Sequence, residues 1–89
     1  MDRINELICN IYELGIIRRD IENWKWTIDD VEVIKNISTR LLLITNDDEV
    51  GFDNLLGMKF EDVRSLLVRK HFEYLRMFRN ELREVCSNE

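Results

Sequence analysis

Residues 58–87, MKFEDVRSLLVRKHFEYLRMFRNELREVCS, predict a long amphipathic helix near the C-terminus. At about 100° per residue, its apolar stripe consists of Phe60, Val63, Leu67, His71, Tyr74, Phe78, Leu82 and Val85. Neither Pro nor Gly interrupts the stretch. A helix of this length extends for about 45 Å, which the rest of so short a chain can hardly cover on every side. We therefore expect a helix over about 59–86 that its own chain leaves partly uncovered.

Two further helices are expected before this one. Apolar residues at helical spacing predict the first over about 3–23, with Gly15 ending it, kinking it, or lying within it where another backbone comes close. A second pattern predicts a helix over about 28–45, beginning at a capping box formed by Thr27 and Asp30. The first two helices should pack as a hairpin against part of the long helix.

The whole chain, 1–89, is expected to form a single all-α domain, a small helical bundle of about three main helices. Its 89 residues are 45% hydrophobic and 35% charged, with no Pro and three Gly, which suits helices joined by short connections. Residues 46–57 form an acidic loop that has room for a short helix over 52–56. Because a core of this size is only just sufficient, a symmetric homodimer is a natural expectation.

Composition narrows the function classes. The net charge of −5 repels nucleic acid phosphates at long range. There is no apolar run near the length of about 18 residues that would span a bilayer, and the N-terminal residues do not form a signal peptide. Two cysteines, Cys9 and Cys86, do not make a disulfide framework, so a cytoplasmic, reduced protein is expected.

The acidic loop resembles a calcium-binding EF-hand loop when Gly51 is aligned with the glycine of that motif. Asn46 and Asp48 then fall on ligand positions. Val50 and Gly57, however, stand where oxygen ligands belong. A solvated turn with helix caps explains the loop better, and we expect no metal and no cofactor.

Residues 52–66, FDNLLGMKFEDVRSL, resemble a helix-turn-helix: a short helix, Gly57 in the turn, and an apolar inner face on the helix that follows. The pattern departs from the motif at Asp53, where a small residue is usual. Glu61 and Asp62 would also face the phosphates. A DNA-binding regulator that dimerises through the long helix is therefore the disfavoured alternative.

Catalysis is not expected. His71 is the one histidine, and its place on the apolar stripe predicts a buried or interface side chain bonded to a neighbour rather than a phosphoryl carrier. Cys9 has no nearby base, and the sequence has neither a Gly-rich phosphate loop nor metal-ligand spacing.

The favoured hypothesis is a small cytoplasmic interaction or regulatory protein that contacts itself, another protein, or both. The two tryptophans at the junction between the first helices either close the end of the bundle or form an exposed binding site. Apolar residues on the flanks of the long helix should stay uncovered, with arginines at the polar rim. The expected interface residues are Trp24, Trp26, Leu66, Phe72, Met77, Arg76, Arg79 and Arg83.

Overall fold

The computed structural model describes residues 2–24 and 31–87, and every element in these ranges is helical. In chain order the elements are α1 (Asp2–Trp24), α2 (Val31–Thr45), the 3₁₀ helix η1 (Asp48–Val50), α3 (Phe52–Leu56) and α4 (Phe60–Ser87). The predicted all-α fold with a long C-terminal helix is confirmed, and α3 falls where a short helix was expected. The start predicted for the second helix, with Thr27 and Asp30, lies outside the described residues.

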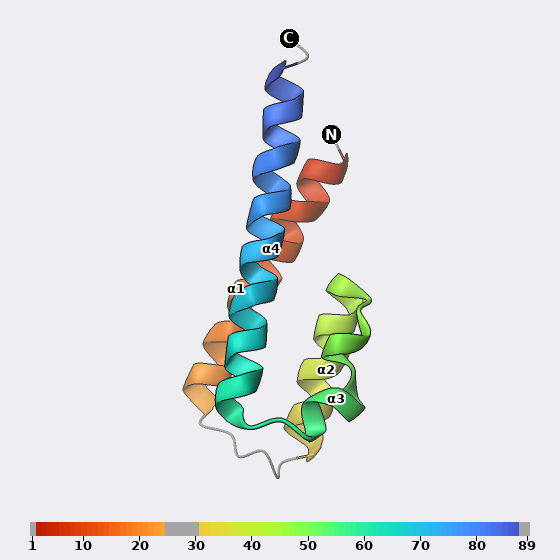
Figure 1. Ribbon diagram of the computed structural model, residues 1–89, viewed down its shortest axis with the longest axis vertical. Helices are drawn as coiled ribbons and strands as arrows, with labels where there is room; N and C mark the ends of the chain where they lie inside the picture. The colour runs from red at the N-terminus through yellow and green to blue at the C-terminus, as the bar shows by residue number, and fades with distance from the viewer. Residues whose placement is uncertain (1, 25–30, 88–89) are drawn as a thin grey trace.

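α1 and α4 lie side by side and run in opposite directions, so that the two ends of the chain lie toward the same end of the molecule (Figure 1). α2 and α3 stand beside the other half of this pair (Figure 1). The resulting shape is elongated, with extents of 52 × 22 × 16 Å. Its radius of gyration is 14.5 Å, against about 12 Å for a compact domain of this length. The cause is α4, whose 28 residues extend well beyond the 15 of α2.

The predicted hairpin of the first two helices is wrong as the main pairing. α1 packs chiefly along α4, whereas α2 makes more of its contacts with α3 and η1 than with α1. The lengths explain this choice, since only the 23-residue α1 can follow α4 over most of its course. Leu7, near the N-terminal end of α1, is fully buried. This burial agrees with α1 packing along α4, since α1 pairs with α4 far more than with α2.

The core lies where α2 and α3 meet the α1/α4 pair. It takes side chains from all of these elements and from η1: Leu14, Ile17, Ile21, Ile34, Ile37, Leu41, Val50, Leu55, Val63, Leu66 and Leu67. Each is at most 4% exposed. Because α2 ends at Thr45, this core stops partway along α4, and the turns of α4 beyond it have less cover.

The connection between α2 and α3 is fixed by local hydrogen bonds. Asn46, at a left-handed φ of 50°, donates its N–H to the carbonyl of Leu42 at 3.0 Å and so ends α2. The Asp47 side chain then accepts from the backbone N–H of Glu49 at 3.0 Å and begins η1. Ser38, buried in α2, donates its hydroxyl to the Val50 carbonyl at 2.9 Å. The loop therefore has a defined place on α2.

Candidate functional site

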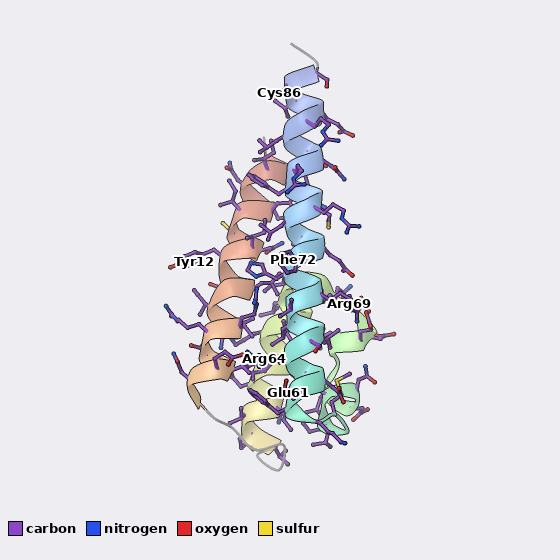
Figure 2. All side chains as sticks on the ribbon, turned by 60° about the vertical axis from the view of Figure 1, so that its left-hand side comes forward. Tyr12, Glu61, Arg64, Arg69, Phe72 and Cys86 are labelled. Atoms are coloured by element: carbon purple, nitrogen blue, oxygen red, sulfur yellow. The ribbon has the colours of Figure 1, made fainter. Side chains whose placement is uncertain are left out.

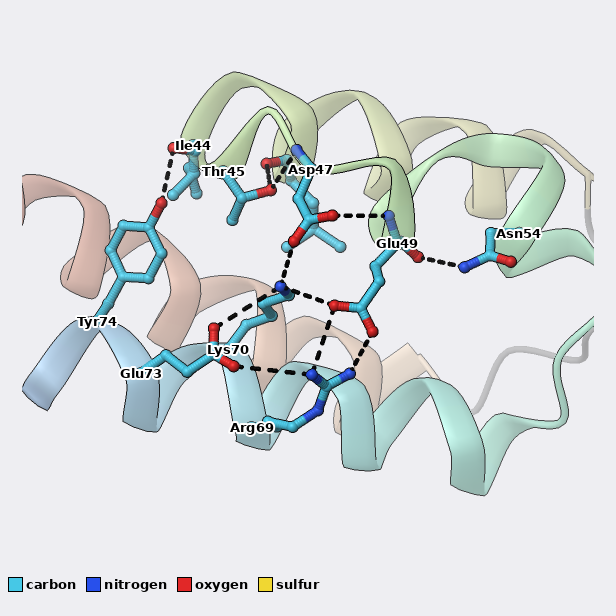
Figure 3. Close-up of polar contacts among 10 residues, drawn as sticks. Ile44, Thr45, Asp47, Glu49, Asn54, Arg69, Lys70, Glu73 and Tyr74 are labelled. Carbon is cyan, nitrogen blue, oxygen red and sulfur yellow. Dashed lines mark hydrogen bonds and ion pairs between the residues drawn. The ribbon is translucent and has the colours of Figure 1, made fainter.

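The acidic loop is bound to α4 by a cluster of ion pairs (Figure 3). Lys70 is 5% exposed, and its Nζ lies 2.6 Å from Asp47 Oδ2 and 3.0 Å from Glu49 Oε1. Arg69 Nη2 lies 2.6 Å from Glu49 Oε2. Asp47 and Glu49 are thus engaged by cations of the same chain, and neither stands on a ligand position of the EF-hand alignment. Within residues 2–24 and 31–87 no group of three or more His, Cys, Asp or Glu side chains is arranged to hold a metal ion.

The pKa values in this cluster show that its members are charged together at neutral pH. A hydrogen bond from Lys70 lowers the pKa of Asp47, and a hydrogen bond from Arg69 lowers the pKa of Glu49. Burial disfavours the charged form of Lys70, but hydrogen bonds to the two carboxylates outweigh burial and raise its pKa overall. We interpret the cluster as a structural contact that holds the acidic loop against α4.

A different surface has the properties of a binding site. α2 lies behind the α1/α4 pair in Figure 2, and the side toward the viewer carries no covering helix among the described residues. We call this side the open face, and it comprises residues that line two grooves, with the exposed Tyr12 of α1 at its edge: Gly15, Arg18, Arg19 and Val68 in one groove, and Phe72, Leu75, Arg76, Arg79 and Leu82 in the other. Tyr12 is 69% exposed and Phe72 is 59% exposed, although both are large aromatic residues. They lie at about the same level on opposite helices (Figure 2).

The half of the open face nearer the chain ends holds an apolar groove of about 530 Å³ on α4. Its lining is Phe72, Leu75, Arg76, Phe78, Arg79 and Leu82. The spacing of these residues places them on adjacent turns of one helix side, since positions three and four apart are neighbours on a helix. The groove therefore combines an apolar floor with an arginine rim.

The other half holds a second groove, of about 570 Å³, between α1 and α4. We call it the basic groove, and its lining is Gly15, Arg18, Arg19, Ile21, Glu22, Arg64, Leu67, Val68 and His71. Among the described residues, Glu22 is the one carboxylate in the lining of either groove, and it forms an ion pair with Arg64 across the helices. Arg19 has no ion-pair or hydrogen-bond partner among residues 2–24 and 31–87.

His71 forms a partly buried polar contact in the basic groove. Its Nδ1 accepts a hydrogen bond from Arg18 Nη1 at 2.8 Å, which requires a neutral ring with the proton on Nε2 because an arginine can only donate. The ring also bonds the backbone of Ile11. Burial, followed by the charge of Arg18, lowers the pKa of His71 below its ordinary value of 6.5. The prediction that His71 is bonded to a neighbour is confirmed.

The predicted interface residues differ in how exposed they are in the structure. Phe72, Arg76, Arg79 and Arg83 are exposed, and the first three belong to the open face. Met77 is half-buried. The prediction that Leu66 stays uncovered is wrong: it is 4% exposed because the core formed with α2 and α3 covers that flank of α4.

The two tryptophans cannot be placed in the same way. Trp26 and the side chain of Trp24 lie outside the described residues. On α2, Leu43 is 84% exposed, whereas Ile44 packs against the core. The α1 half of the open face was missed, because it depends on how α1 and α4 are paired. Gly15 in mid-helix, followed closely by Arg18 and Arg19, was the available signal.

No family model matches the chain. Comparisons with curated proteins and with solved structures also found no match. Among the described residues, no helix is both long enough and apolar enough to cross a membrane. The functional argument therefore depends on the surface itself.

Proposed function

We propose that this protein is a small interaction or regulatory protein that binds another protein through the open face and performs no chemistry of its own. The observation that carries the proposal is the exposure of two large aromatic residues, Phe72 on α4 and Tyr12 at about the same level on α1. Exposing a large aromatic side chain to water is unfavourable in free energy, and burying it in a complex removes that penalty. Such residues dominate the binding energy of many interfaces.

The apolar groove suits an amphipathic helix from the partner. Side chains of Phe72, Leu75 and Leu82 repeat at the spacing that a helix laid along α4 can match with its own apolar stripe. Arg76 and Arg79 at the rim favour acidic residues beside that stripe. We therefore infer a partner with an acidic amphipathic helix, although the binding chain itself carries a net charge of −5.

A second copy of the chain is a weaker fit to this face. In a symmetric dimer the same patch meets itself, so the arginines of one open face would approach those of the other. Like charges brought together in an interface oppose association. We therefore favour a different protein over a homodimer at this surface.

The DNA-binding alternative gains no support from the contacts of residues 52–66. Arg64, one of the two cations in this stretch, lies in ion pairs with Glu22 and Glu61, which compete with a phosphate for it. Glu61 and Asp62 are exposed at the first turn of α4. Both would repel the DNA backbone.

The test is affinity capture from extract of the cells that produce the protein, with two matched variants. Phe72→Ser removes the central aromatic residue of the open face. Leu43→Ser removes an apolar residue of α2 that is even more exposed, 84% against 59% for Phe72, and lies outside that face. We expect wild type and Leu43→Ser to retain the same partner, and Phe72→Ser to lose it while keeping its helical circular dichroism. Equal retention by Phe72→Ser would refute the proposal.

Light scattering behind a sizing column completes the test. A dimer that forms in the purified protein and disappears in Phe72→Ser, but not in Leu43→Ser, would assign the open face to a second copy instead.

A further inference from the structure

Gly15 is unexplained by the fold. Glycine is among the least favourable residues in a helix interior, because it has the most backbone freedom to lose. Here it lies in the middle of the continuous helix α1, and its φ is not in the left-handed region. A Cβ built at this position would meet its nearest neighbour, His71 Cε1, at 3.7 Å, an ordinary van der Waals contact. Neither backbone conformation nor crowding therefore requires glycine.

What the missing side chain does provide is space in the basic groove, which Gly15 lines. The same groove presents donors that the fold does not use. Arg18 spends one N–H on His71 and Arg19 has no partner among the described residues. The guanidinium group offers five N–H donors in a planar fork that matches a carboxylate or a phosphate. Val68 provides a partly exposed apolar wall beside these donors, above the buried Ile21 and Leu67.

We propose that the basic groove is a binding site for an oxyanion, a carboxylate or phosphate group carried on an apolar body. Arg18 and Arg19 bind the anionic group, and the absence of a side chain at Gly15 lets it approach the backbone of α1 where that residue lines the groove. His71 acts as a positioning residue: its Nδ1 holds Arg18 at 2.8 Å while its other nitrogen is tied to the backbone of α1. The apolar wall at Val68 contacts the remainder of the ligand.

This site does not rest on the proposed function. Arg18 and Arg19 belong to the open face, but Phe72 lines only the apolar groove, so loss of a protein partner in Phe72→Ser and loss of anion binding in Arg19→Gln are separate outcomes. An acidic side chain of a protein partner and a small free metabolite present the same chemistry to Arg18 and Arg19. The choice of probes must therefore separate a phosphate from a carboxylate.

The experiment is a titration of the full chain with inorganic phosphate and, separately, with hexanoate, followed by amide and imidazole NMR shifts. We expect saturable shifts at Gly15 and His71 with at least one probe. Stronger binding of hexanoate would identify a carboxylate on an apolar body, and stronger binding of phosphate would identify a phosphoryl ligand. Arg19→Gln should weaken binding roughly tenfold, as expected for the loss of a charged hydrogen-bond donor.

Three variants separate this site from its alternatives. Arg83→Gln removes an exposed arginine of α4 outside the groove and should leave the affinity unchanged. Gly15→Ala should raise the midpoint of unfolding and weaken anion binding at the same time, which misfolding cannot produce. Phe72→Ser should bind the anion like wild type even if it loses its protein partner. The absence of saturable shifts with either probe, or equal losses in Arg19→Gln and Arg83→Gln, would overturn the proposal.

Discussion

Replacing Ser38 by alanine should destabilise the fold more than its size suggests. The Ser38 side chain is 2% exposed and its hydroxyl donates to the Val50 carbonyl at 2.9 Å. Val50 is fully buried, and this hydroxyl is the partner that the described residues provide for its carbonyl. The substitution leaves that carbonyl without a hydrogen bond in a site that water does not reach.

The magnitude follows from the two parts of this loss. A buried neutral hydrogen bond contributes about 1 kcal/mol net, and leaving the acceptor unsatisfied raises the total to about 1.5 kcal/mol. Removing one small atom leaves no cavity large enough to add a further cost. In a domain of this length such a change lowers Tm by roughly 6–12 °C.

Thr39→Ala is the matched control, because it also deletes a hydroxyl from α2. Thr39 is exposed, and its Oγ1 donates to the Lys35 carbonyl at 2.8 Å, where water can replace it. We expect a change within about 0.5 kcal/mol. Urea unfolding followed by circular dichroism measures both variants. Equal destabilisation of the two, or a Ser38→Ala stability indistinguishable from wild type, would refute the assignment of this hydrogen bond.

Three further outcomes are expected. Lys70→Met should destabilise by about 2 kcal/mol in urea unfolding, less than the loss of a fully buried ion pair, because the carboxylates that Lys70 binds are partly exposed; an unchanged midpoint would contradict this. Because the folded pKa of His71 lies below its ordinary 6.5, the unfolded chain takes up the proton first, so stability should fall as pH drops below about 6.5 and level off below the folded pKa. Urea midpoints measured across this range should lose that step in His71→Gln, and a step that persists would assign it to another group. Gly15→Ala should stabilise by about 1 kcal/mol in thermal unfolding, and a lower Tm would mean that the helix needs glycine here.

Helix positions were predictable because they depend on spacing along the chain. The apolar stripe of α4 predicted a helix that the structure has from Phe60 to Ser87. The apolar stripe of α4 is broad enough to contact two neighbouring helices. The spacing of its residues therefore could not predict which flank of α4 the rest of the chain would cover. Leu66 and Phe72 looked equivalent in the sequence, yet α2 and α3 bury the first and leave the second in water.

The polar contacts were harder to predict because their partners are far apart in the chain. Lys70 lies next to the apolar stripe, and the acidic loop that neutralises it precedes it by about two dozen residues. Arg18 and His71 are separated by 53 positions and meet only through the antiparallel register of α1 and α4. A lysine on an apolar helix side, paired with an acidic loop, was the one clue in the sequence to the first contact.

Because α2 is short, the free energy of local opening should decrease along α4 toward its C-terminal end. Tyr74 donates to the Ile44 carbonyl at 3.1 Å close to the end of α2, and beyond that point α4 pairs mainly with the first turns of α1. Backbone amides near Leu82 should exchange with solvent through local opening, while those near Leu67 should exchange only on global unfolding. Both chain ends lie in the weaker half, so this opening begins at the two ends together.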